Sequence, residues 1–110
     1  MPIHNKLVRD KIPEVITKTG KDFSTKVLSE SEYVIELKKK LGEELQEYME
    51  ATNDEEAIEE LADILELLQA ASKMHGSSVE ALEQVRKDKA EKRGGFEKRV
   101  FLIEVEDDEA

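Results

Sequence analysis

Two stretches with helical periodicity, joined by a short turn, constrain this chain more than any other feature. The first begins after Ser29 and runs to about Glu50, and the second runs from about Asp54 to His75. A connection this short makes two helices antiparallel neighbours. The sequence therefore predicts a helix hairpin at the centre of the fold.

Each stretch carries an apolar stripe. Because an α-helix advances about 100° per residue, side chains three and four positions apart share one face. In the first stretch this face holds Val34, Leu37, Leu41, Leu45 and Tyr48. In the second stretch it holds Ile58, Leu61, Leu65 and Leu68, widened by Ala57, Ile64 and Ala71. We expect these stripes to form the hydrophobic core.

Short sequence motifs predict where the helices begin and end. Ser29–Glu32 and Thr52–Glu55 each read as a capping box. Gly76 is expected to end the second long helix, and a third helix is expected from Ser77–Ser78 to the pair Gly94–Gly95.

The two ends of the chain carry shorter elements. Pro13 suits the first turn of a short helix that stops at Gly20. Phe23–Leu28 and Val100–Val105 have β-like composition. Their pairing would add a small two-stranded sheet.

Acidic residues lie on or beside the apolar face of both long helices. Around the helix axis Glu44 lies about 60° from Leu41. Glu47 is three residues after Glu44 and is therefore its neighbour on the same face. Glu60 falls inside the apolar arc of the second helix, and Asp63 lies at its edge. Burying unpaired carboxylates is costly, so their placement needs an explanation.

These four acids lie at similar distances from the turn, so the hairpin can bring their carboxylates together. Oxygen-only ligands suit a hard cation such as Mg²⁺ or Mn²⁺. The alternative is a solvated charged face, because 40% of the residues are charged. The paired arrangement favours the metal site.

Composition and charge argue against several classes of function and site. The 110 residues fit one domain, residues 1–110, and the net charge of −10 argues against binding nucleic-acid polymers. Absence of Cys excludes disulfides and thiolate sites. The sequence shows no signal-peptide pattern and no membrane-length apolar run. We expect a cytoplasmic protein that does not bind membranes.

Basic side chains gather in two places in this acidic chain. Lys6, Arg9 and Lys11 lie in the N-terminal arm, and Lys89 and Arg93 share one face of the third helix. Both groups are candidates to hold phosphate oxygens. The alternatives are a solvated N-terminal segment and surface charges that favour a helix C-terminus.

These motifs resemble a known family. Glu43-Glu44-x-x-Glu47 followed by Glu60-x-x-Asp63 resembles the signature of the all-α nucleoside triphosphate pyrophosphatase superfamily, which includes MazG-like proteins and phosphoribosyl-ATP pyrophosphohydrolases. The segments Asn5–Pro13 and Arg93–Phe96 look like the two ends of small stand-alone members.

The resemblance implies cleavage of a nucleotide between its α and β phosphates. Glu44, Glu47, Glu60 and Asp63 would hold Mg²⁺, or Mn²⁺, and Glu43 would be a further ligand or a base for water. Lys6, Arg9, Lys11, Lys89 and Arg93 would hold phosphates. The second motif continues with Ile64–Leu67, without the aromatic and His residues of the histidine-pathway enzymes. This departure favours a nucleoside triphosphate, in a house-cleaning role, over phosphoribosyl-ATP.

The sequence thus predicts a mainly α protein, a helix bundle completed by formation of a homodimer or homotetramer. Its predicted function is Mg²⁺-dependent nucleotide pyrophosphohydrolysis. Two alternatives stay open: a phosphoribosyl-ATP pyrophosphohydrolase and a non-catalytic helical interaction module. A di-iron site is disfavoured, because neither His4 nor His75 follows a Glu by three residues.

Overall fold

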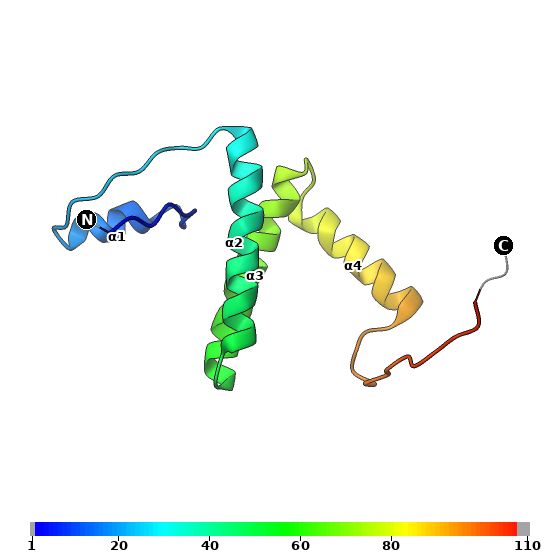
Figure 1. Ribbon diagram of the computed structural model, residues 1–110. Helices are drawn as coiled ribbons and strands as arrows, with labels where there is room; N and C mark the ends of the chain where they lie inside the picture. The colour runs from blue at the N-terminus through cyan, green and yellow to red at the C-terminus, as the bar shows by residue number, and fades with distance from the viewer. Residues whose placement is uncertain (1, 108–110) are drawn as a thin grey trace.

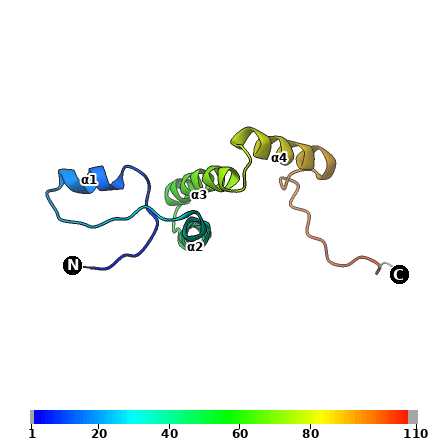
Figure 2. The same cartoon turned by 90° about the horizontal axis from the view of Figure 1, so that it is seen from above.

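The computed structural model describes residues 2–107, and these residues form four helices and no strand. They are α1 (Ile12–Lys18), α2 (Glu30–Glu50), α3 (Asp54–Met74) and α4 (Val79–Arg93). The prediction of a mainly α fold is confirmed. Figure 1 shows α2 and α3 as an antiparallel pair, with α1 and α4 on opposite sides of it. The view from above gives the same arrangement (Figure 2).

Local sequence signals explain where the long helices begin. The Ser29 hydroxyl accepts a hydrogen bond from the Glu32 amide, and the Glu32 carboxylate accepts one from the Ser29 amide. This is the predicted capping box. At the start of α4, the Ser78 hydroxyl accepts from the Ala81 amide.

The cap of α3 differs by one residue from the prediction. Asn53, not Thr52, is the N-cap, and its side chain accepts from the Glu56 amide at 2.8 Å. The Glu56 carboxylate reaches back to the amide of Thr52. Asn is among the strongest N-cap residues, so it prevails over the neighbouring Thr and the predicted box Thr52–Glu55 does not form.

The predicted sheet is also absent from the described residues. Phe23–Leu28 and Val100–Val105 are extended but unpaired. The first segment lies on the α1 side of the hairpin and the second on the α4 side (Figures 1 and 2). Since the hairpin separates them, neither finds a partner strand within one chain.

The core differs from the prediction as well. Leu37 is the one hydrophobic side chain that is fully buried in the described part of the chain. On α3 the predicted stripe Ile58, Leu61, Leu65 and Leu68 is exposed, with Ile58 at 65% and Leu65 at 57%, whereas Ala57, Ile64 and Ala71, which were predicted to widen it, are half-buried. The half-buried positions of α3 include Ala57, Glu60, Ile64, Leu67 and Ala71. These positions share a face, so α3 has two apolar stripes, and α2 covers only the second.

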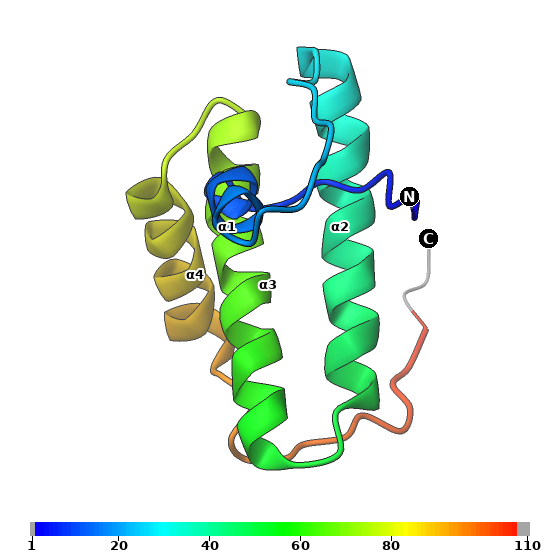
Figure 3. The same cartoon turned by 90° about the vertical axis from the view of Figure 1, so that its left-hand side faces the viewer.

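The molecule is open rather than compact. Its radius of gyration is 18.9 Å, against about 13 Å for a compact domain of this length. Its accessible surface is 10410 Å², whereas a compact monomer of 12.6 kDa exposes about 6200 Å². Seen from the α1 side, the hairpin stands as two upright helices (Figure 3), and α4 leads away from the end of α3 (Figure 1). A single chain therefore leaves about 4200 Å² more surface in water than a compact fold would.

Candidate metal centre

Three carboxylates meet between the two long helices. Glu44 and Glu47 lie one turn apart on α2, and Glu60 lies on the stripe of α3 that faces α2. One oxygen from each of the three lies within 4.8 Å of the other two. This spacing allows all three to bind one ion.

The cluster contains buried polar atoms without partners. Glu44 is only 7% exposed, although it carries a carboxylate. The Oε2 atoms of Glu44 and Glu60 are buried and accept no hydrogen bond. Ionised carboxylates have no proton to donate, so they cannot satisfy each other. A proton or a cation is needed to make the arrangement stable.

The electrostatics of Glu60 reflect this crowding. Burial, together with the neighbouring carboxylates of Glu44 and Glu47, raises the pKa of Glu60 from 4.5 to about 7. Near neutral pH a large share of the protein therefore holds a proton on Glu60. That proton lets two carboxyl groups share a hydrogen bond.

Lys40 is a member of the site that the sequence reasoning missed. Its ammonium lies 3.4 Å from Oε1 of Glu44 and 3.9 Å from Oε2 of Glu43, and its side chain is only 20% exposed. It pairs with Oε1 of Glu44, whereas Oε2 of Glu44 is buried without a hydrogen-bond partner. The four-residue spacing between Lys40 and Glu44 was the available signal, but it was hidden in the run Lys38–Lys40.

The other two predicted acids lie outside the three-acid group. Glu43 faces Lys40. Asp63 accepts a hydrogen bond from Arg9, with Nη2 and Oδ1 at 2.6 Å. Asp63 remains one turn from Glu60 on α3 and therefore on the same side of that helix.

The predicted phosphate-binding residues do not gather in one place. Arg9 contacts Asp63, whereas Lys6 and Lys11 have exposed side chains in the same arm. Lys89 and Arg93 are exposed on α4, on the other side of the hairpin. Within one chain, these basic groups therefore form two separate sets.

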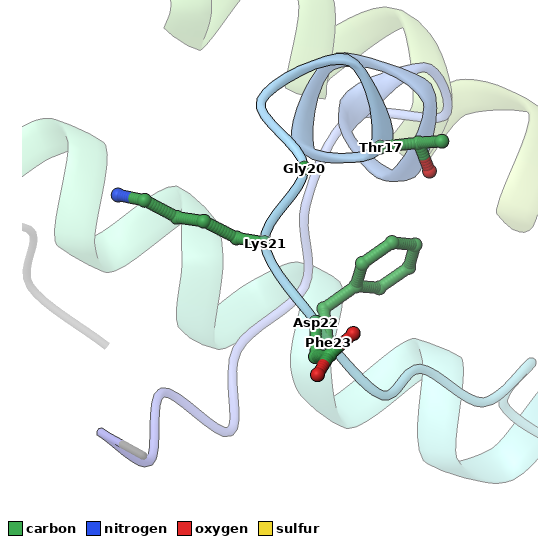
Figure 4. A pocket seen from close by; sticks show the side chains of 5 residues that line it. All are labelled: Thr17, Gly20, Lys21, Asp22 and Phe23. Carbon is green, nitrogen blue, oxygen red and sulfur yellow. The ribbon is translucent and has the colours of Figure 1, made fainter.

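The surface hollows do not coincide with the acidic cluster. One lies at the end of α1, lined by Thr17, Gly20, Lys21, Asp22 and Phe23. There the Lys21 side chain points away from the Phe23 ring (Figure 4), so no set of charged groups converges. A second hollow lies at the turn between α2 and α3.

Comparison of the chain with models of known protein families, with curated proteins and with solved structures gives no match. Among residues 2–107, no helix combines the length and the apolar character needed to cross a membrane. Functional inference therefore rests on the geometry of the side chains described above.

Proposed function

We propose that this protein is a Mg²⁺-dependent nucleotide pyrophosphohydrolase, acting in the cytoplasm on a nucleoside triphosphate. The observation that carries the proposal is the cluster of Glu44, Glu47 and Glu60, in which Oε2 of Glu44 is buried and lacks a hydrogen-bond partner. A solvated charged face does not bury an unpartnered carboxylate oxygen. A hard divalent cation bound by oxygen ligands explains it.

The reaction is the one that the resemblance implies, and the residues at the site can be assigned roles in it. Glu44, Glu47 and Glu60 would hold the ion, and Asp63 would join them when Arg9 releases it. An ion held there would supply charge neutralisation at the phosphates and would lower the pKa of water. A water molecule would add to phosphorus, the anhydride bond between the α and β phosphates would break with departure of the other phosphoryl portion, and the water proton would pass to a carboxylate. The products are a nucleoside monophosphate and pyrophosphate.

Glu43 has two candidate roles in this scheme. It lies one residue before Glu44 and faces Lys40 at 3.9 Å, so it is either a further ligand or the base that accepts the water proton. The candidates for binding the substrate phosphates are exposed basic residues, namely Lys6, Arg9, Lys11, Lys89 and Arg93.

We also propose that the chain works as a homodimer or homotetramer. The exposed residues Ile58, Leu61, Leu65 and Leu68 are spaced by three and four along α3, which is the pattern of a helix–helix seam. A standard interface covers about 800 Å² per partner, far less than the surface that the single chain leaves uncovered. A second copy of the hairpin is the simplest cover.

The exposed stripe also supports a second candidate, a non-catalytic interaction module. In that case the stripe would bind another protein and the acids would carry no metal. The two candidates differ in their response to divalent ions, because only the enzyme needs the cluster. Phosphoribosyl-ATP remains the alternative substrate for the enzyme.

The test is pyrophosphate release from a panel of canonical and modified nucleoside triphosphates, with Mg²⁺ or with EDTA. Glu60→Ala is compared with Glu66→Ala, which removes the same charge from an exposed position of the same helix. We expect release with Mg²⁺ only, lost in Glu60→Ala and kept in Glu66→Ala. No release from any nucleotide or from phosphoribosyl-ATP, by folded protein, would favour the interaction module.

A further inference from the structure

The N-terminal arm, residues 2–29, is joined to α3 through one polar contact. α1 packs against none of the other three helices in the described structure. Between this arm and α3, the structure contains one side-chain hydrogen bond, from the Arg9 guanidinium to Asp63. The contact spans 54 positions of sequence, so it fixes the position of a distant segment.

This contact lies beside the acidic cluster. Asp63 follows Glu60 by one helical turn and shares its face of α3. The Arg9 guanidinium therefore occupies a carboxylate at the margin of the candidate metal centre. A divalent cation that engaged Asp63 would compete with Arg9 for the same oxygens.

The ion pair between Arg9 and Asp63 is exposed to solvent and can be replaced by other contacts. The Arg9 side chain is 59% exposed and the Asp63 side chain is 40% exposed. Exposed ion pairs contribute little net free energy, so a divalent cation can displace the guanidinium at small cost. Lys40 pairs with Glu44 in more buried surroundings, which makes it the less mobile of the two cations at the site.

A released Arg9 has an obvious second partner. The guanidinium presents paired donors that match phosphate oxygens. Lys6 and Lys11 lie within three residues of it on the same exposed arm. The arm would thus deliver positive charge to a phosphate that is bound next to the cation.

We propose that Arg9 is a positioning residue that exchanges partners. It binds Asp63 while the cation is absent and moves to a ligand phosphate once a divalent cation engages Asp63. The exchange couples the two binding events, because metal occupancy frees the group that captures phosphate. This inference rests on the proposed function, since it requires the cation and the phosphate.

The exchange predicts opposite effects of one substitution on two affinities. Arg9→Gln removes the competitor for Asp63, so Mg²⁺ should bind roughly threefold more tightly without nucleotide. The same variant loses a phosphate partner, so inorganic pyrophosphate at saturating Mg²⁺ should bind at least about threefold more weakly. A merely structural role of Arg9 would not move the two affinities in opposite directions.

Isothermal titration calorimetry measures both affinities. Lys18→Gln is the matched control, because it removes one positive charge from an exposed position of the same arm and corrects for long-range electrostatics. Asp63→Asn removes the same ion pair together with a metal ligand, so it should weaken Mg²⁺ binding where Arg9→Gln strengthens it. Arg9→Lys should restore part of the pyrophosphate affinity.

The outcomes separate this proposal from the function on which it rests. If the wild-type protein binds Mg²⁺ but Arg9→Gln binds it no better than Lys18→Gln does, the exchange is wrong and the metal centre stands. If the wild-type protein binds no divalent cation, both the exchange and the proposed function fall.

Discussion

At the residue scale, the candidate site combines the carboxylates of Glu44, Glu47 and Glu60 with basic side chains that pair with acids in or beside this group. Helical arithmetic was sufficient to bring Glu44, Glu47 and Glu60 to facing stripes, and the structure places them within 4.8 Å. Helical spacing could not predict the ion pairs that Lys40 and Arg9 form. Long basic side chains reach in many directions, so their partners depend on tertiary structure rather than on spacing alone.

The raised pKa of Glu60 makes the stability of the cation-free protein depend on pH. Folding raises the pKa from 4.5 to about 7, so the folded state binds a proton more tightly than the unfolded state. The resulting stabilisation is complete below pH 4.5 and is lost as the pH rises through about 7. Urea denaturation in EDTA should show this decline in wild type and a flatter profile in Glu60→Gln.

Glu66→Gln is the control for that profile, because Glu66 is exposed. Equal slopes for wild type and Glu60→Gln would show that Glu60 does not titrate in this window. Because a cation must replace the proton, Mg²⁺ affinity should rise with pH up to about 7 and then level off.

Lys40 should stabilise the protein most when no cation is bound. Lys40→Gln leaves the buried Glu44 without its cationic partner, which should cost about 1–3 kcal/mol in EDTA at pH 8. Lys39→Gln, at an exposed neighbouring position, should cost little. Saturating Mg²⁺ should recover more stability in Lys40→Gln than in wild type, and an equal response in both would contradict this role.

At the element scale, the helices were predictable and the remaining segments were not. The start of α2 at Ser29 and the ends of α3 before Gly76 and of α4 at Gly94 follow local side-chain and backbone rules that act within a few residues. The segments Phe23–Leu28 and Val100–Val105 have strand composition, but a strand needs a partner. No local rule could say that the hairpin would keep these two segments apart.

Gly42 gives a prediction at this scale. It lies in the middle of α2, and a Cβ atom added there would meet nothing within 4 Å. Gly42→Ala should therefore raise the free energy of unfolding by about 1 kcal/mol through helix propensity alone. Thermal unfolding at low protein concentration measures this gain. A loss of stability would mean that a second copy approaches α2 at this point.

At the scale of the whole molecule, one chain does not cover its own apolar surface. The sequence predicted a core stripe of Ile58, Leu61, Leu65 and Leu68 on α3, yet all four are exposed, and the half-buried apolar positions include Ile64, which was predicted only to widen that stripe, and Leu67. Composition could not distinguish the two stripes, because both are apolar. Which one α2 covers depends on the rotation of α3 about its axis, and the acid Glu60 lies on the covered side.

The uncovered stripe predicts the oligomeric state. In light scattering coupled to size exclusion, the wild-type protein should have at least twice the mass of a 12.6 kDa chain. Leu65→Glu places a charge in the exposed stripe and should shift the protein to monomer. Val27→Glu, at a position 99% exposed outside the stripe, should leave the mass unchanged. A monomeric wild-type protein would contradict the proposed assembly.

The most direct test of the metal centre is a Mg²⁺ titration of thermal unfolding in Glu44→Gln and Glu59→Gln. Each variant removes one negative charge, but Glu44 is buried in the cluster and Glu59 is exposed on α3. We predict that Mg²⁺ raises the unfolding temperature of wild type and Glu59→Gln and not that of Glu44→Gln. If Mg²⁺ stabilises Glu44→Gln as much as the wild-type protein, the three carboxylates are not a metal centre. The same conclusion follows if Mg²⁺ does not stabilise the wild-type protein.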